Sequence, residues 1–435
     1  MSNANANAIA VEELRVGMFV ELEGGWLSHP FPLSAFKLSS PEQIDTLRGL
    51  GLNRVHWVPE KSDLLAPAAA ELPPCVEPPQ LRNAEAARAE PPAPVSPASP
   101  IALKARALHL QLEAARRCES QRNKVESQLR QLLSTVEAQP REAGRATVAL
   151  TQSMLDNMLD EDEVGIRLLA AGTDREMAHA LNVSVISLLI GRTLGMTEAD
   201  LVDLGVGALL HDVGKQALPK RQRQLVDGLS AAELQAYREH VNLSLQLGAR
   251  MALSPGSLAV LAQHHEQADG EGFPLRLAGD RISLAARVVA IVNCYDGLCN
   301  PRSTAQGLTP HEAVAMLFAK HRQRFDGMVL NAFIRMMGVY PAGSIVQLTD
   351  DRYALVVGAN SSRPLKPRVL VFDPKVSRAQ ALLLDLEHER DLGIRRSLTA
   401  QKLPADAWNY LNPRPRVSYY FEPLVPKNSC MGRVS

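Results

Sequence analysis

The sequence predicts a mainly α protein: a helical bundle that follows a small N-terminal α/β module and precedes a short C-terminal β-hairpin or sheet extension. Three observations predict this fold class. The bundle, residues 142–343, repeats helix-start chemistry, with a capping Ser or Thr followed by Pro or Glu in the first turn. Residues 101–139 contain neither Pro nor Gly and space their apolar side chains at helical intervals. The extension, residues 344–435, changes to short β-type runs.

The N-terminal module is expected over residues 9–65. Strands are expected at Val16–Val20 and Val55–Val58. A helix is expected to begin at Ser40-Pro41, where Ser caps the helix and Pro fits its first turn. A unit this small cannot be an enzyme by itself, so we expect an accessory or regulatory module.

Residues 66–100 are rich in Pro, Ala and Glu, and they predict a linker because such a segment cannot bury enough apolar surface to fold. A long connecting helix is expected over residues 101–139. Its apolar side chains are Leu108, Leu112, Val125, Leu129, Leu132 and Val136. The helix either forms a homodimer through a coiled coil or packs on its own domain, and a break in the apolar stripe around residues 116–124 leaves both open.

The C-terminal extension is expected to begin with a hairpin. Two short apolar runs, Ile345–Leu348 and Tyr353–Val357, flank a pair of aspartates that suits the turn. A third strand is expected at Val369–Phe372. The tail beyond Ala400 is expected to be mostly irregular and to pack on the helical domain.

Charge and cysteine usage exclude several classes of function. Lys+Arg and Asp+Glu both number 47, so no net field favours duplex DNA or an anionic membrane as a partner. The five cysteines are scattered and form no C-x-x-C pair, which argues against a disulfide framework and a zinc finger. Without a signal-peptide pattern or an apolar run of membrane-spanning length, we expect a cytoplasmic protein with no membrane span.

Five histidines and one aspartate predict a metal site: His179, His211, Asp212, His240, His264 and His265. A single His on an apolar helix is more often a packed core residue, and His56, His109, His311 and His321 are assigned to that class. The doublets His211-Asp212 and His264-His265 are harder to explain that way, because adjacent residues near a helix end can reach two neighbouring ions. Imidazole and carboxylate ligands without Cys favour iron or manganese over structural zinc.

Two further features accompany the doublets. Lys215 falls on the same helical side as Asp212, and a compact ammonium suits a phosphate oxygen. The loop Asp269–Pro274 follows the second doublet, and its two glycines and proline predict a tight turn whose backbone N–H groups approach a ligand. Alone, the lysine would be a solvated side chain and the loop only a turn.

Taken in order, these motifs resemble the HD-GYP family of bacterial cyclic di-GMP phosphodiesterases. The resemblance rests on His179, His211–Lys215, His240 and the run from His264 to Pro274. Residues 325–344 resemble the end of that domain. Residues 14–18 and 26–36 resemble an accessory domain of unknown function that often precedes it. Together these segments cover most of the chain outside the linker.

The resemblance implies an HD-type helical bundle with two or three divalent metal ions, usually iron or manganese. It implies that a metal-activated hydroxide attacks phosphorus in line, giving pGpG and, in some members, GMP. Asp212 and Lys215 are the implied catalytic residues. The implied metal ligands are the five histidines, Asp212 and Asn293, and the implied substrate-binding residues are Lys215, Arg302, Asp269 and Gly272.

The chain also departs from the family pattern. Asn293 stands where the family has a metal-ligating Asp, so a negative charge is lost, while Asp296 keeps the second acidic position. Arg175 replaces a Glu that accompanies a third metal in some members, and two metals are therefore expected. Losses of substrate-binding groups are expected at Thr304 for a Tyr, Ala305 for a basic residue, Phe273 for a Tyr and Gln267 for an Arg.

Three functions are compatible with these residues. The first is an active cyclic di-GMP phosphodiesterase. The second is an impaired member, suggested by Asn293 and Ala305, that binds metal or a nucleotide, or only a protein partner, and signals by contact. The third is an HD hydrolase for another phosphoester, such as a mononucleotide or (p)ppGpp, against which the Asp269–Pro274 loop argues.

Overall fold

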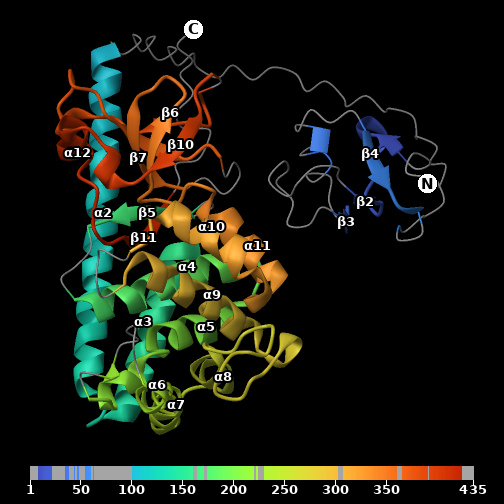
Figure 1. Ribbon diagram of the computed structural model, residues 1–435, viewed down its shortest axis with the longest axis vertical. Helices are drawn as coiled ribbons and strands as arrows, with labels where there is room; N and C mark the ends of the chain where they lie inside the picture. The colour runs from blue at the N-terminus through green and yellow to red at the C-terminus, as the bar shows by residue number, and fades with distance from the viewer. Residues whose placement is uncertain are drawn as a thin grey trace, which may run out of the picture. The chain divides into compact units, whose positions relative to one another are not determined.

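The computed structural model divides into two compact units, Met1–Ala105 and Arg106–Ser435 (Figure 1). The residues that it describes are 8–21, 35–38, 44, 47–48, 54–59, 62, 100–159, 164–170, 174–219, 222–223, 230–301, 307–359, 365–389 and 391–423.

The first unit contains a four-stranded antiparallel sheet in the order β1-β4-β2-β3. Its strands are β1 (Ala8–Ala10), β2 (Phe19–Glu21), β3 (Ala35–Lys37) and β4 (Arg54–Trp57), with a 3₁₀ turn η1 at Val11–Glu13. The buried core consists of Val11, Leu14, Val20, Leu38, Ile44, Leu47 and Val55. The two predicted strands correspond to β2 and β4, whereas β1 and β3 were not expected. The helix start predicted at Ser40-Pro41 lies outside the described residues.

The second unit is a helical bundle that carries a β-sheet at one end (Figure 1). Its helices are α2 (Pro100–Thr135), α3 (Pro140–Leu159), α4 (Arg175–Thr193), α5 (Glu198–Leu210), α6 (Ala231–Arg238), α7 (His240–Arg250), α8 (Pro255–Gln263), α9 (Leu284–Cys299), α10 (Pro310–Lys320), α11 (Gly327–Met337) and α12 (Ala405–Leu411). α4 is buried along nearly its whole length, because α5, α9, α11 and β11 all pack against it. The predicted mainly α class is confirmed.

The long predicted helix is present as α2. Its C-terminal half buries Cys118, Val125, Leu129 and Leu132 within the same unit, so this part of the apolar stripe packs on its own domain. Toward the N-terminus, Leu112 of the same stripe is 39% exposed. Dimerisation through this helix stays a prediction.

The sheet of the second unit has the order β10-β6-β7-β5-β11, with β8 pairing with β7 and β9. Its strands are β5 (Val164–Leu169), β6 (Ile345–Leu348), β7 (Tyr353–Gly358), β8 (Arg368–Val371), β9 (Leu384–Asp385), β10 (Ile394–Leu398) and β11 (Ser418–Pro423). The hairpin and third strand predicted in the extension are confirmed as β6, β7 and β8.

One prediction about secondary structure is wrong, and one strand was not expected. β5 lies within residues 142–343, the predicted bundle, where no strand was expected. The tail was expected to be mostly irregular, but it contains α12 and β11, and β11 pairs antiparallel with β5 over its full length. A short apolar run is ambiguous between helix and strand. Each of these two runs forms a strand because the other provides its backbone hydrogen-bond partners.

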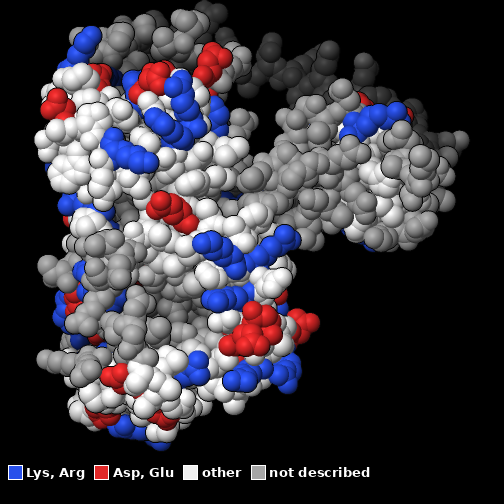
Figure 2. Space-filling view, viewed as in Figure 1, with Lys and Arg blue, Asp and Glu red and all other residues white. Residues whose placement is uncertain are grey.

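Figure 2 shows basic and acidic side chains interspersed on the visible face, in keeping with the balanced charge of the sequence. Among the described helices, none combines the length and the apolar character that a membrane crossing requires.

Candidate metal centre

The His211-Asp212 doublet lies where a helix ends. α5 stops at Leu210, His211 is its C-cap, and the 3₁₀ turn η3 (Val213–Ala217) follows. A Cβ at Gly214 would collide with backbone atoms of His240 and Ser244, so glycine lets η3 pack directly on α7. The Ser244 hydroxyl accepts the Gly214 N–H (2.9 Å) and donates to the His211 carbonyl (3.0 Å). The doublet is thereby fixed against the helix that carries His240.

His240 lies at the start of a helix. α6, which begins with a capping box of Ser230 and Glu233, ends at Arg238, and His240 is the first residue of α7. Residues 231–247 contain no Pro or Gly, so the sequence gives no sign of this break. The break leaves the Tyr237 carbonyl available to the His240 ring, which donates to it from Nδ1 (2.6 Å).

Three of the histidines are oriented by a backbone carbonyl three residues earlier in the chain. Nδ1 of His211, His240 and His264 lies 2.8, 2.6 and 3.0 Å from the carbonyl oxygens of Ala208, Tyr237 and Leu261. A carbonyl only accepts, so Nδ1 carries the proton in each ring, and in the neutral imidazole the lone pair is on Nε2. This is the arrangement by which a backbone carbonyl orients a metal-ligating His.

His179 is oriented by a different helix. It lies in the first turns of α4, whose N-cap Asp174 accepts the N–H groups of Glu176 and Met177. Its Nδ1 lies 2.6 Å from Oδ2 of Asp296 on α9. Its Nε2 consequently points at Nε2 of His211, 3.2 Å away.

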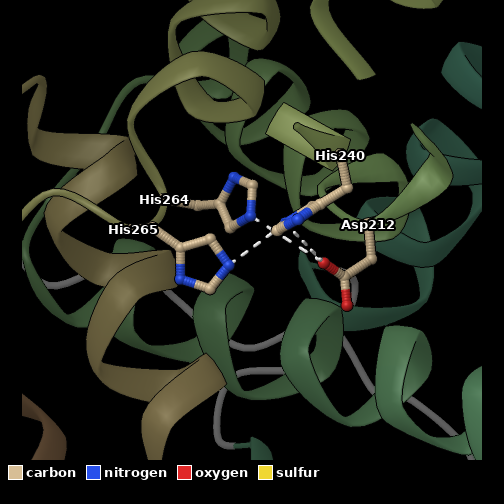
Figure 3. Close-up of side chains that lie close together, drawn as sticks. All are labelled: Asp212, His240, His264 and His265. Carbon is tan, nitrogen blue, oxygen red and sulfur yellow. Dashed lines mark hydrogen bonds and ion pairs between the residues drawn. The ribbon is translucent and has the colours of Figure 1, made fainter. Parts of the chain in front are cut away.

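The five histidines and Asp212 form two clusters that share Asp212. The four-ligand cluster contains Asp212, His240, His264 and His265 (Figure 3), and the three-ligand cluster contains His179, His211 and Asp212. In each cluster the ligand atoms lie within 4.8 Å of one another. Oδ1 of Asp212 lies 3.5 Å from His240 Nε2 and 3.8 Å from His264 Nε2, whereas Oδ2 lies 3.4 Å from His211 Nε2 and 3.6 Å from His179 Nε2.

The donor atoms fit divalent metal ions. Burial lowers the pKa of His211 to about 4 and lowers the pKa of His240, His264 and His265, so these rings are neutral near pH 7. Among the described residues, Asp212 Oδ1 and His264 Nε2 are buried without a hydrogen-bond partner. Buried acceptors that face one another are costly unless a cation lies between them. Imidazole and carboxylate donors suit iron or manganese.

Lys215 lies beside the shared carboxylate. Its Nζ is 2.5 Å from Asp212 Oδ2 and 5.1 Å from the centre of the Tyr237 ring. Burial alone would raise the pKa of the Asp212 carboxyl, but the Lys215 ammonium and the neighbouring imidazoles hold it well below its ordinary value. Burial opposes the charge on Lys215, yet Asp212 raises its pKa above the ordinary value. The pair is therefore charged, with an ammonium at the edge of the site.

The loop after the second doublet packs directly on it. A Cβ at Gly272 would collide with backbone atoms of residues 265–267, and the Phe273 ring stacks on His265 with centroids 4.5 Å apart. Glu266 is 1% exposed, and its two carboxylate oxygens accept the N–H groups of Leu275 (2.7 Å) and Leu277 (2.9 Å). Glu266 therefore ties the far side of the loop to the helix end that carries His264 and His265.

Two of the remaining predicted residues, Asp269 and Asn293, are described by the structure. Asp269 accepts the N–H of Glu271 (3.0 Å), which shapes the turn. Asn293 is half-buried on α9, about one turn before Asp296. Arg302, Thr304 and Ala305 lie outside the described residues.

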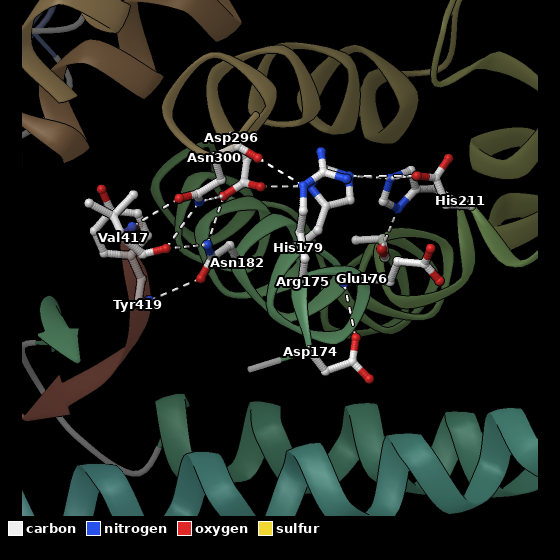
Figure 4. Close-up of polar contacts among 12 residues, drawn as sticks. Asp174, Arg175, Glu176, His179, Asn182, His211, Asp296, Asn300, Val417 and Tyr419 are labelled. Carbon is white, nitrogen blue, oxygen red and sulfur yellow. Dashed lines mark hydrogen bonds and ion pairs between the residues drawn. The ribbon is translucent and has the colours of Figure 1, made fainter. Parts of the chain in front are cut away.

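Sequence reasoning missed the polar residues that support the ligands. Asp296 was predicted only to keep the second acidic position, whereas its carboxylate bonds His179 and the amides of Asn182 and Asn300 (Figure 4). Asn182 falls about one helical turn after His179, which is the one signal that could have singled it out. Ser244 has no recognisable motif. Glu266 lies within the run from His264 to Pro274, but no role was predicted for it.

Residues 163–329 match the HD domain family, and residues 7–147 match a domain of unknown function, DUF3391. A cyclic di-GMP phosphodiesterase of Pseudomonas aeruginosa, PA4108, is 30% identical over 430 residues, which cover 93% of this chain and 94% of that protein. The cyclic di-GMP phosphodiesterase response regulator RpfG of Xanthomonas campestris is 29% identical over 35% of this chain and 41% of its own length. A solved structure, the HDG"Y"P protein Bd1817 of Bdellovibrio bacteriovorus, aligns with a TM-score of 0.39 and 15% identity over 75% of this chain and 97% of that chain.

Proposed function

This chain belongs to the HD-GYP family, and we propose that it is a metal-dependent phosphodiesterase that hydrolyses cyclic di-GMP to linear pGpG. The observation that carries the proposal is the pair of clusters that share Asp212. A carboxylate between two sets of imidazoles is the arrangement that two neighbouring divalent ions require, and paired ions suit in-line phosphoryl displacement. The relative named a cyclic di-GMP phosphodiesterase matches this chain from end to end, which supports the choice of substrate.

The ligands are proposed to be the five site histidines and Asp212, with Asn293 as a further, neutral oxygen donor. When bound, iron or manganese ions would lower the pKa of a water molecule and neutralise charge on the phosphoryl oxygens. The protein fixes the donors beforehand: His211, His240 and His264 by a backbone carbonyl three residues earlier, and His179 by Asp296. Because burial lowers the pKa of His211, His240, His264 and His265, no proton has to leave these four rings before a metal binds.

Lys215 is proposed to contact a non-bridging phosphate oxygen. In the structure its ammonium bonds Asp212, the carboxylate that both clusters share. A phosphodiester bound beside the metals would therefore lie close to the positive charge of Lys215. The loop of Asp269 and Gly272 is proposed to line the substrate site, since it packs on His265. Arg302 is proposed to bind the second phosphate.

Asn293 favours a second candidate function. An amide oxygen at this position provides no negative charge, so the ion that it faces would be held less tightly than by a carboxylate. An impaired member could still bind cyclic di-GMP and signal through a protein partner. DUF3391, the residue 101–139 helix and a homodimer through that helix would then be the means of transmission.

The variant Asn293→Asp separates the two functions. Full-length wild-type and variant proteins are loaded with manganese without oxygen, and turnover of cyclic di-GMP is measured by chromatography of the products. Similar rates, with pGpG formed by both, support the active enzyme. A variant that gains more than about tenfold over a nearly inert wild type supports the impaired member. A parallel panel with (p)ppGpp and mononucleotides tests the third function, which preferential hydrolysis of one of them would support.

A further inference from the structure

The orientation of His179 depends on a chain of polar contacts that ends at the C-terminal strand. Asp296, which bonds His179 Nδ1 through Oδ2, is 1% exposed. Its Oδ1 accepts from the amide nitrogens of Asn182 (2.7 Å) and Asn300 (2.8 Å). A buried carboxylate is stable only when such donors satisfy it. The two asparagines are therefore what keeps Asp296 in place.

Both asparagines are in turn held by the backbone beside β11 (Figure 4). The Asn182 amide donates to the Val417 carbonyl (3.1 Å) and accepts the Tyr419 N–H (3.0 Å). The Asn300 amide donates to the same carbonyl (3.0 Å) and accepts the Val417 N–H (2.9 Å). Because each oxygen accepts a backbone N–H, each NH₂ group is directed at Asp296.

β11 is itself firmly anchored in the second unit. It pairs with β5 from Ser418 to Pro423, and the buried carboxylate of Glu422 forms ion pairs with Arg167 and Arg368. From α2, the Cys118 thiol donates to the Phe421 carbonyl (3.1 Å) and Arg122 Nε donates to the Ser418 hydroxyl (3.1 Å). The strand thus offers the asparagines a fixed row of backbone groups.

The two metal clusters differ in this support. His211, His240 and His264 bond backbone carbonyls three residues earlier in the chain, and none of those bonds passes through Asp296. Only the three-ligand cluster contains His179. A disturbance of the asparagines would therefore reach one metal position and spare the other.

We propose that Asn182 and Asn300 are positioning residues for the metal held by His179, His211 and Asp212, and that β11 is an integral part of that half of the site. The inference rests on the proposed metal-dependent function. It assigns the C-terminal segment a role in the binding of one of the two metal ions. This segment lies outside residues 163–329, which match the HD domain.

The test is a manganese titration of full-length protein stripped of metal, for wild type, Asn182→Ala and Asn300→Ala. Calorimetry gives the affinity of each binding step, and electron paramagnetic resonance distinguishes coupled pairs of manganese ions from single ions. Loss of an outer partner of a ligating His costs about 10–100-fold in metal affinity. We expect one step to weaken by that factor, the other to stay unchanged, and the coupled signal to give way to that of single ions.

Two reference variants serve as the positive and the negative control of this titration. His179→Ala removes the ligand itself and is expected to abolish the same step. Tyr295→Phe is the matched control, because it removes a buried hydroxyl from α9 and its 3.1 Å contact with Tyr419 without touching either amide. Should an alanine variant fail to fold, Asn182→Ser and Asn300→Ser, which keep a short polar group, replace it.

The outcomes separate the two proposals. Wild-type protein that takes up no metal overturns the proposed function, and this inference with it. Wild-type protein that binds two ions, with asparagine variants that titrate like Tyr295→Phe, overturns the inference alone. Equal weakening of both steps also overturns it, because the contacts would then stabilise the domain in general.

Discussion

The two halves of the metal site are built in different ways. In the four-ligand cluster, His240 and His264 are oriented by carbonyls of the preceding helical turn, and His265 is covered by the loop that follows it. In the three-ligand cluster, His179 depends on Asp296 and, through two asparagines, on a strand near the end of the chain. Ligands in a contiguous motif are therefore oriented mostly by residues near them in the sequence. An isolated ligand has to be supported by the tertiary structure.

The largest effect is expected from Asp212→Ala, which breaks both halves at once. Asp212 supplies one oxygen to each cluster, so its loss should weaken both metal-binding steps by more than the ~100-fold that an outer partner costs. Calorimetric titration with manganese checks this, with Asp280→Ala on an exposed turn as the control. Retention of one tight step would show that the clusters do not share this ligand.

Removal of the metals should lower the stability of the protein. A ligand present at about 1,000 times its Kd stabilises the folded state by about 4 kcal/mol, and each ion here would do so. We expect chelation to lower the Tm of wild-type protein clearly. His179→Ala should lose part of that difference and Asp212→Ala nearly all of it, as calorimetric unfolding can show. A Tm that chelation leaves unchanged would contradict the metal site.

The protein without metal should lose stability in acid. His211 is buried with its pKa lowered from 6.5 to about 4, so between these values the unfolded chain binds a proton that the folded chain does not. Stability from this group is complete above about pH 6.5 and falls as the pH drops toward 4, by roughly 1.4 kcal/mol per pH unit. The lowered pKa values of His240, His264 and His265 act in the same direction.

Urea unfolding of the chelated protein at several pH values measures this slope. His211→Gln, which removes one of the four groups, should flatten it, and His56→Gln in the other unit serves as the control. A slope that is the same in all three proteins would show that His211 is not buried in its neutral form.

A smaller effect is expected from Glu266→Gln, which loosens only the four-ligand half. One of the two backbone N–H groups would lose its acceptor, and a buried unsatisfied donor costs about 1–3 kcal/mol. We expect a lower Tm and reduced turnover of cyclic di-GMP, with metal content retained. Glu271→Gln on the exposed part of the same loop is the matched control. Equal behaviour of the two variants would argue against a role of Glu266 in holding the loop.

The difference between the halves also explains what the sequence could predict. The helical bundle, the hairpin at β6 and β7 and the two doublets follow from local periodicity and from adjacent residues. The strands β5 and β11, which are far apart in the chain, form because each supplies the other's ladder. The support of Asp296 uses backbone groups of Val417 and Tyr419, which any side chain at those positions would offer, so no pattern of residue types could indicate it.

Product analysis tests the central claim most directly. Full-length protein, prepared without oxygen and loaded with iron or manganese, is incubated with cyclic di-GMP, and the mixture is resolved chromatographically for pGpG and GMP. We predict that pGpG accumulates with the wild type and is absent with a variant that carries both His211→Ala and Asp212→Ala. Wild-type protein that holds two metal ions and forms no product would contradict the proposed hydrolysis and favour a signalling role without catalysis.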